Sequence, residues 1–341
     1  MTLNVDLDKQ GAMRFYSLNN NTMKKCKHLK SSFRLKNVWY AFLFLTTGCF
    51  IGILLTRYGY VLEKIDVKVT IVGGNSTNDL FHSPEVGTDN NNTKFRVPNI
   101  VHFIWFGKNR EMTFIQMVSI MSAHKIQQPD VIMFHCDFLP SGKYWDELKR
   151  NIPIKIIHRD QPKEIFGQSI LHVYHRGDIA KLQILQEFGG IYMDYDVIMV
   201  NKMNQLRRFD MVIGQEKRKK FNAGIILSHK DAIFLKLWYE SYRNNYRAFD
   251  WDYNCGRLPY GIYLERPDLL HVEPYKFTTP DWTERHLLFN EVINWRELYA
   301  IHLMLHLDWT KYTPETVKTL NNTFGEVVRY VYYGDSKVIQ N

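Results

Sequence analysis

Mostly apolar runs and amphipathic helical stripes alternate along the chain from residue 97 onward. Runs typical of buried strands lie at residues 100–105, 131–136, 154–158, 191–193, 197–200, 211–214 and 223–228. Helical spacing of apolar residues predicts helices at residues 114–126, 143–150, 178–188 and 231–246, and a final helix and strand are expected near the C-terminus. Because buried strands joined by helices form sheets covered on both faces, this pattern predicts an α/β domain with a mostly parallel sheet.

A different apolar run precedes this domain, from Val38 to Thr56. Its nineteen residues carry no charge, and at about 1.5 Å per helical residue they span a bilayer core of about 30 Å. Residues 1–37 hold eight Lys or Arg and two Asp, so the positive-inside rule predicts a cytosolic N-terminus. A cleaved signal peptide is less favoured, because 37 residues precede the run and no small-x-small cleavage site follows it.

This pattern divides the chain into four parts. They are a cytosolic basic tail (1–37), a transmembrane signal anchor (38–56), a stem (57–96) and a lumenal domain (97–341). The stem is rich in Gly, Asn, Ser and Thr, as flexible connectors are. Glycosylation sequons begin at Asn75, Asn91 and Asn321 on the predicted lumenal side. Together these features predict a single-pass type II membrane protein.

Charge distribution argues against a nucleic-acid partner. The formal net charge is +9 over 341 residues, but +6 lies in residues 1–37 and only about +3 remains for the rest. The signs in that remainder are interspersed, without a basic stripe that could follow phosphates. Cys136 and Cys255 could pair in an oxidising compartment, or could equally stay as two free thiols.

The strongest chemical signal is an Asp-x-Asp pair. This pattern occurs three times, at residues 6–8, 194–196 and 250–252, so the spacing alone is weak evidence. Only Asp194 and Asp196 follow an apolar strand and a helix-ending glycine pair. In an extended chain, residues two apart share a face. Two carboxylates so placed suit Mn²⁺ or Mg²⁺, which could clamp a diphosphate.

Around this pair the residues carry a family likeness. The motif Arg-Gly-Asp-Ile-Ala-Lys at 176–181, followed by Gly-Gly-Ile-Tyr-Met-Asp-Tyr-Asp at 189–196, resembles the signature of the DXD-sugar glycosyltransferases of family 32. Residues 97–107 are similar to the first strand of that family, and residues 222–225 and 300–302 to its later motifs. The four motifs appear in the family's order over about residues 97–310. The resemblance implies a GT-A-like, Rossmann-related fold.

For the metal, the resemblance implies a defined set of ligands. Asp196 would bind Mn²⁺ (or Mg²⁺) directly, and Asp194 would act through the donor ribose or a bridging water. Both aspartates are therefore the implied catalytic residues. His302 would reach the metal or the diphosphate, as a neutral imidazole can, with His306 as the rival. Judged without the family, His302 is more often a core residue than a ligand.

For the donor, the resemblance implies five binding residues. Asp178 would hold the donor sugar and Trp105 would stack on or flank the nucleobase, with Tyr192 and Asn222 beside them. Lys181 occupies the position where the family usually has arginine, so it keeps a point charge but lacks the bidentate fork. On pattern alone, Asp178 would be an acid at a helix N-terminus and Trp105 a core residue.

The implied function is metal-dependent transfer of a hexosyl residue from a nucleotide-sugar, with UDP-sugars favoured. The acceptor would be a glycan, glycolipid or glycoprotein, transfer would retain the anomeric configuration, and the enzyme would sit in the Golgi membrane. Two alternatives stay open. One is a catalytically weakened carbohydrate-binding or scaffold homologue, because of Lys181. The other is a haloacid-dehalogenase-type phosphatase with Asp194 as nucleophile.

Overall fold

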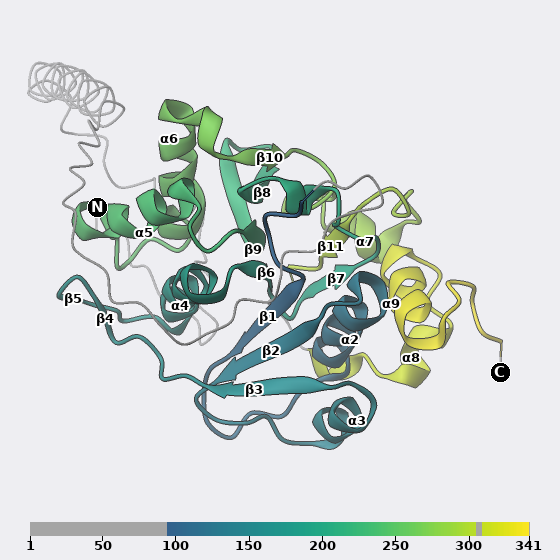
Figure 1. The fold of residues 1–341 in the computed structure, drawn as a ribbon. Helices are drawn as coiled ribbons and strands as arrows, with labels where there is room; N and C mark the ends of the chain where they lie inside the picture. The colour runs from purple at the N-terminus through teal and green to yellow at the C-terminus, as the bar shows by residue number, and fades with distance from the viewer. Residues whose placement is uncertain (1–93, 305–308, 341) are drawn as a thin grey trace, which may run out of the picture. The chain divides into compact units, whose positions relative to one another are not determined.

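A seven-stranded sheet organises the computed structural model, which describes residues 94–304 and 309–340 (Figure 1). From one edge to the other its strands are β10 (His271–Glu273), β8 (Met211–Glu216), β9 (Lys220–Ser228), β6 (Gly190–Met193), β1 (Ile100–Trp105), β2 (Val131–Cys136) and β3 (Ile154–His158). Strand β9 runs antiparallel to both of its neighbours, whereas the other four pairings are parallel. The mixed α/β architecture with a mostly parallel sheet is confirmed.

Helices cover both faces of this sheet, because its central strand is buried on both sides. Along β1, Val101, Phe103 and Trp105 belong to one apolar cluster, whereas Ile104 belongs to another. The first cluster is covered by α2 (Phe114–Ser122), α3 (Lys143–Asn151), α7 (His286–Asn290), α8 (Pro314–Lys318) and α9 (Thr323–Tyr333). The second is covered by α4 (Val173–Phe188), α5 (Ile233–Asn245) and α6 (Leu258–Glu265). The predicted two-sided helical cover is therefore present.

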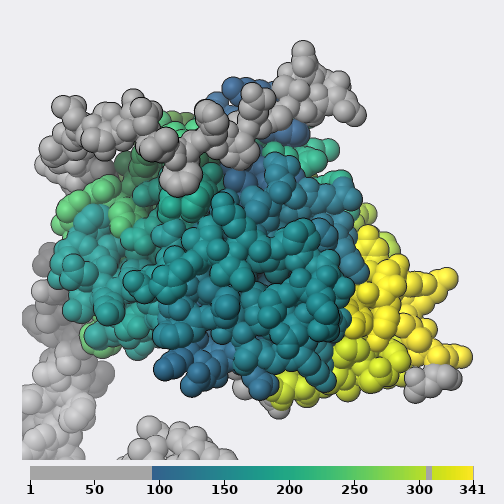
Figure 2. All heavy atoms as spheres, turned by 60° about the horizontal axis from the view of Figure 1, so that its bottom comes forward, coloured from purple at the N-terminus to yellow at the C-terminus, as the bar shows by residue number. Residues whose placement is uncertain are grey.

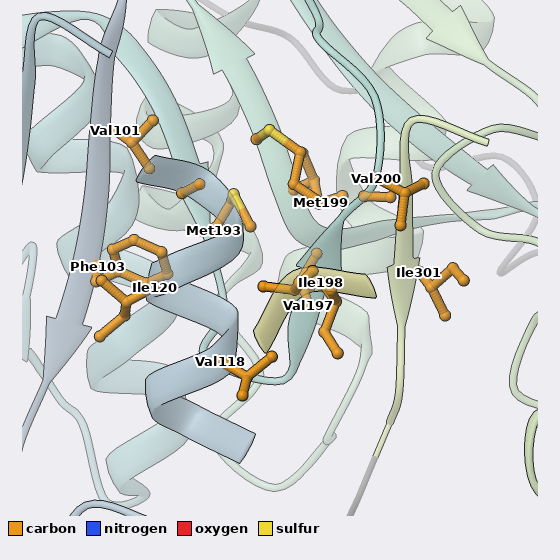
Figure 3. Packing of buried hydrophobic residues seen from close by; sticks show 14 of the residues in the cluster. Val101, Phe103, Val118, Ile120, Met193, Val197, Ile198, Met199, Val200 and Ile301 are labelled. Carbon is orange, nitrogen blue, oxygen red and sulfur yellow. The ribbon is translucent and has the colours of Figure 1, made fainter. Parts of the chain in front are cut away.

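Figure 3 shows the first cluster, with α2 beside β1 and β7 (Val197–Met199). In Figure 2 the C-terminal segments (yellow) lie beside earlier parts of the domain (teal). Among these contacts, α9 packs on α2. Strand β7 does not join the central sheet. It pairs antiparallel with β11 (Ala300–His302), and this small sheet brings the end of the domain against its middle.

A glycine pair fixes the passage from α4 into β6. The helix ends at Gly189 (φ +65°), and Gly190 (φ +109°) opens the strand. A Cβ on Gly190 would lie 2.7 Å from the Ile100 carbonyl oxygen and 2.8 Å from Nε2 of the buried His102. Only glycine fits this combination of positive φ and close approach. The glycine pair therefore marks a strand that must pass directly over a histidine ring.

Several elements differ from the sequence prediction. Helix α4 begins at Val173 rather than at 178, so Asp178 lies in its second turn. The helix expected over 114–126 is α-helical only to Ser122 and continues as a π-helix over Ala123–Gln127. A short hairpin, β4 (Glu164–Ile165) and β5 (Gln168–Ser169), was not predicted. The expected terminal strand was wrong, since residues 334–340 form none.

The predictions for the N-terminal tail, the anchor and most of the stem fall outside the described residues, as do His306 and the first Asp-x-Asp. Within residues 94–304 and 309–340 the structure contains no helix with the length and apolarity that crossing a membrane requires. Cys136 and Cys255 are both free thiols, so the pairing alternative does not hold.

Candidate metal and donor site

The two aspartates lie on the tight connection between β6 and β7. Strand β6 ends at Met193, and the Val197 amide donates to the Asp194 carbonyl at 3.1 Å, which closes a turn. The Asp194 amide in turn donates to the Gly224 carbonyl at 2.8 Å. The predicted extended alternation was therefore wrong in detail. The carboxylates converge because the chain turns between them, at the carboxyl end of a central strand where ligands of such sheets bind.

Pairing of β7 with β11 places a histidine beside them. In this pairing His302 lies opposite Val197, and the Leu303 amide donates to the Asp196 carbonyl at 2.8 Å. His302 Nε2 lies 3.1 Å from Asp196 Oδ1. One ligand atom each from Asp194, Asp196 and His302 lie within 4.8 Å of one another. Two carboxylates and an imidazole are thus brought to one point from segments about a hundred residues apart.

Asn222 fixes which nitrogen of His302 faces the carboxylates. Its Oδ1 accepts the Gly224 amide at 2.9 Å, and its Nδ2 donates to Glu216 Oε1 at 3.1 Å, so the orientation of the amide is determined. His302 Nδ1, at 3.0 Å from Asn222 Oδ1, must therefore carry the proton of that hydrogen bond. The ring presents Nε2 to Asp196. Such support of the second nitrogen is how proteins orient ligating histidines.

Gly224 is required by the closeness of this ring. A Cβ at Gly224 would lie 2.6 Å from Cε1 and 2.7 Å from Nδ1 of His302. Burial lowers the pKa of His302, but the charges of Asp196 and then Asp194 outweigh it and leave the pKa raised. Without a cation, the ring therefore tends to hold a proton on the atom that faces Asp196. A divalent cation would replace that proton.

Lys181 is the positive charge on the other side of Asp194. Its Nζ lies 3.0 Å from Asp178 Oδ1 and 3.9 Å from Asp194 Oδ1, and donates to the Ala223 carbonyl at 3.2 Å. Burial lowers its pKa, but the charges of Asp194 and Asp178 raise it well above the ordinary value. The side chain is buried. Lys181 therefore does not lie on a solvated face of α4.

Burial raises the pKa of Asp194, and the charge of Asp196 adds to this, whereas Lys181 works against it. The hydroxyl of Tyr192 donates to Asp194 Oδ1. Asp178 is not at a helix N-terminus but faces Lys181 from within α4. The structure thus joins Asp178, Lys181, Tyr192 and Asp194 in one hydrogen-bonded and charged group.

Trp105 is placed differently from its expected role. The side chain has 0% exposure and packs against Phe134 and Tyr195, with ring centroids 6.3 Å and 5.5 Å away. The Arg110 guanidinium lies 4.6 Å from its ring. Its Nε1 has no hydrogen-bond partner among the described residues. A nucleobase could stack on Trp105 only if Tyr195 or Arg110 moved.

Sequence reasoning missed Glu216. Its carboxylate is buried, accepts from Asn222 and lies 3.2 Å from Lys220 Nζ. Lys220 in turn lies 2.9 Å from Asp252, in the third Asp-x-Asp. A signal existed, because Gln215 and Glu216 directly prolong the apolar run 211–214, and a charged residue at the end of a buried strand is uncommon.

Comparison with known proteins identifies the region that holds this site. Residues 109–218 match the family model described as "Glycosyltransferase sugar-binding region containing DXD motif". The matched region contains Asp178, Lys181, Tyr192, Asp194 and Asp196, whereas Trp105, Asn222 and His302 lie outside it. The match agrees with the resemblance drawn from the motifs and gives no support to the phosphatase alternative.

One relative extends the likeness along the chain. Glucan organizing enzyme 1 of Cryptococcus neoformans var. grubii serotype A is 24% identical over 262 residues, which cover 68% of this chain and 70% of the relative.

Solved structures overlap more loosely. PaToxG glycosyltransferase overlaps at 20% identity and a TM-score of 0.35, over 50% of this chain and 70% of its own. The galactosyltransferase LgtC, solved with donor and acceptor sugar analogues, overlaps at 13% identity and a TM-score of 0.40, over 71% and 98%. With TM-scores of 0.35 and 0.40, these overlaps transfer no detail of a site.

Proposed function

We propose that this chain, which is a glycosyltransferase, transfers a hexosyl residue from a nucleotide-sugar to a glycan, glycolipid or glycoprotein acceptor with the help of a divalent cation. One observation carries the proposal: Asp194, Asp196 and His302 offer ligand atoms within 4.8 Å of one another. The two aspartates lie in the region that matches the sugar-binding family model. A UDP-sugar donor, a GT-A-type fold and retention of configuration are proposed from the family resemblance.

The residues present fit a divalent cation. Carboxylate oxygens suit Mn²⁺ and Mg²⁺, and an imidazole nitrogen tilts the choice toward Mn²⁺. His302 is oriented for ligation by Asn222, which holds its Nδ1–H at 3.0 Å. When bound, the cation would neutralise the donor diphosphate and stabilise the charge that develops as the nucleotide leaves.

Lys181 adds a second cationic group on the sugar side of the site. In the transfer, the bond between the anomeric carbon and the diphosphate oxygen breaks and the nucleotide diphosphate leaves with the electron pair. A bond to the acceptor oxygen forms, and the proton of the acceptor hydroxyl passes to the departing diphosphate. Lys181 lies 3.0 Å from Asp178 and 3.9 Å from Asp194, so it pairs with both buried carboxylates. Asp178 then remains available to accept a hydrogen bond from a donor sugar hydroxyl.

We also propose the cellular placement predicted above: a Golgi membrane enzyme of type II, anchored by residues 38–56, with residues 97–341 as the lumenal catalytic domain. The support is the charge asymmetry around the apolar run and the sequons beyond it. Glycosidase treatment of the expressed chain should lower its mass through Asn75, Asn91 or Asn321. Asn20 begins a further sequon, on the predicted cytosolic side. Glycosylation at Asn20 alone would contradict the predicted orientation.

The direct test is donor hydrolysis by the full chain. The purified protein is incubated with UDP-glucose, UDP-galactose, UDP-N-acetylglucosamine or GDP-mannose, with Mn²⁺ or with EDTA. We expect nucleotide release from at least one donor, lost in EDTA and restored by Mn²⁺. Donor binding without release would favour the weakened carbohydrate-binding homologue. Nucleotide release that EDTA leaves unchanged would overturn the proposal.

A further inference from the structure

One face of α4 leads from the proposed donor site to an exposed aromatic surface. Tyr174, Gly177, Asp178 and Lys181 are spaced at i, i+3, i+4 and i+7, so they lie along the same side of the helix. Asp178 and Lys181 belong to the site described above. Tyr174 lies one turn earlier, about 6 Å along the helix axis from Asp178. This is about the size of one sugar ring.

Tyr174 is part of a ring stack that continues onto the loop after α5. Its ring centroid lies 4.0 Å from that of Trp251 and 5.0 Å from that of His172, with the His172 ring parallel to it. Trp251 is 54% exposed and its neighbour Phe249 is 87% exposed. A large, half-exposed ring held beside other rings is a candidate element of a binding site.

The loop that carries Trp251 is held in place by polar contacts of its own residues and of α4. His175 is buried, and its ring nitrogens lie 3.1 Å from the Tyr246 hydroxyl and 3.2 Å from the Asp250 carbonyl oxygen. Asn254 exchanges two hydrogen bonds with the Arg247 backbone, at 2.9 Å and 2.8 Å. Arg257 Nη2 lies 2.6 Å and 2.7 Å from the two carboxylate oxygens of Asp250. The fold therefore builds and fixes the exposed position of the Trp251 ring.

Between the rings and Asp178 lies a gap at Gly177. This glycine is inside the helix and does not have a positive φ, yet a Cβ there would meet no atom within 4 Å. Nothing in the described residues requires glycine, and alanine is the more favourable residue in a helix interior. The missing side chain therefore leaves open space beside the helix backbone at Gly177.

We propose that His172, Tyr174 and Trp251, with the gap at Gly177, form the subsite for the acceptor sugar. A pyranose ring has an apolar C–H face that packs on aromatic rings, and its hydroxyls reach polar groups at its edge. A ring packed on Trp251 and Tyr174 would pass over Gly177 and present its edge toward Asp178. The use of the sugar as an acceptor rests on the proposed function, whereas its binding does not.

The test compares sugar binding by the full chain and by three variants. The probes are methyl glycosides and trisaccharides of glucose, mannose, galactose and N-acetylglucosamine, and saturation-transfer NMR identifies the pyranose protons that contact the protein. Trp251→Ala removes the ring, and Gly177→Ala fills the gap. Gly261→Ala is the matched control, because Gly261 also lies in a helix where an added Cβ would meet no atom within 4 Å.

We expect at least one probe to bind through C–H protons of one ring face, and at least tenfold weaker binding in Trp251→Ala and Gly177→Ala. Gly261→Ala should bind like the unmodified chain, and both Gly→Ala variants should melt at a higher temperature than it. With a donor present, the ratio of transfer to hydrolysis should fall at least tenfold in Trp251→Ala, through a higher acceptor KM.

The inference is overturned if no probe binds the unmodified chain, if Trp251→Ala binds as well as it does, or if the two Gly→Ala variants behave alike in binding. It is also overturned if Trp251 instead mediates adhesion to phosphatidylcholine–phosphatidylserine vesicles. If the chain hydrolyses a donor but Trp251→Ala binds sugar as well as the unmodified chain, the proposed function stands and this subsite is refuted. If Trp251→Ala loses sugar binding but the chain hydrolyses no donor, the sugar subsite stands and the proposed function is refuted.

Discussion

The chain contains the same Asp-x-Asp spacing at 194–196 and at 250–252, and the structure gives the two pairs opposite surroundings. Asp250 and Asp252 form salt bridges with basic side chains. Arg257 pairs with both, and Lys220 pairs with Asp252. These contacts lower the pKa of Asp252 despite its partial burial. Asp250 and Asp252 therefore form ion pairs within the protein that hold their loop closed.

Asp194 and Asp196 instead face each other and a histidine. Burial raises the pKa of Asp194, and Asp196 adds to that, because two carboxylates compete within one site. Lys181 is shared with Asp178, to which it is closer. Acidic spacing therefore does not define a metal site. The side chains that the fold places beside the two aspartates decide whether they pair with a Lys or Arg of the protein or need a metal cation.

The largest expected effect separates the two pairs by activity. Asp196→Asn keeps the shape but removes the charge that would hold the cation, so turnover should fall by about a thousandfold, corresponding to several kcal/mol. The melting temperature should stay close to that of the unmodified chain, because a residue in a turn contributes little to packing. Donor turnover and thermal melting measure both. Equal losses of turnover in Asp196→Asn and Asp252→Asn would contradict the claim that the two aspartate pairs have different roles.

Lys181→Ala should have the next largest effect, and on both stability and donor use. It leaves Asp178 and Asp194 without their buried cation, at a cost of about 3–5 kcal/mol. Donor affinity should weaken roughly ten- to hundredfold, as expected for loss of a charge-assisted contact. Lys181→Arg should keep the charge and retain turnover. If Lys181→Ala has an unchanged melting temperature and an unchanged donor KM, then Lys181 neither stabilises Asp178 and Asp194 nor contacts the donor.

Glu216→Ala should weaken the site from a distance. Asn222 would lose the acceptor that fixes its amide, and His302 would lose its fixed orientation, so about ten- to hundredfold more Mn²⁺ should be needed for half-maximal turnover. Glu216→Gln still offers an oxygen to Asn222 and should change this concentration much less. If the two variants are equally impaired, the charge of Glu216 matters rather than its hydrogen bond.

The smallest effect is expected from Asp252→Asn. It breaks ion pairs with Lys220 and Arg257 whose side chains are partly exposed, and such pairs contribute about 0–1 kcal/mol. Chemical denaturation should show that small loss, with donor turnover retained. Loss of turnover in Asp252→Asn would mean that the ion pairs from Asp252 through Lys220 to Glu216 affect catalysis as well as stability.

Strand positions could be predicted because each strand is a short apolar run bounded by polar or Gly-rich segments. The bounds of β1, β2 and β3 match the predicted ones. The start of α4 could not be found, since Gly177 follows directly on its first turn and its N-cap is His172, whose side chain makes no capping hydrogen bond. The expected terminal strand is absent, since residues 334–340, which follow α9, pair with no strand of the described sheets.

The acidic pair could be selected from the sequence, because the glycines and the apolar strand before it are local signals. The partners of that pair could not be derived from local pattern. His302 reaches Asp196 only through the pairing of β7 with β11. Asn222 meets Glu216 across a hairpin in which the register of β8 against β9 shifts after Ile213. Such contacts depend on strand pairing and on a bulge, which apolar periodicity does not encode.

The most direct measurement is Mn²⁺ binding to the full chain, followed through the electron paramagnetic resonance signal of the free ion. We expect a site in the unmodified protein that Asp196→Asn weakens by at least a hundredfold and that Asp252→Asn leaves intact. UDP should tighten Mn²⁺ binding in the unmodified protein, since the diphosphate would share the cation. Equal Mn²⁺ affinity in the unmodified chain and in Asp196→Asn would refute the assignment of Asp194, Asp196 and His302 as the cation site.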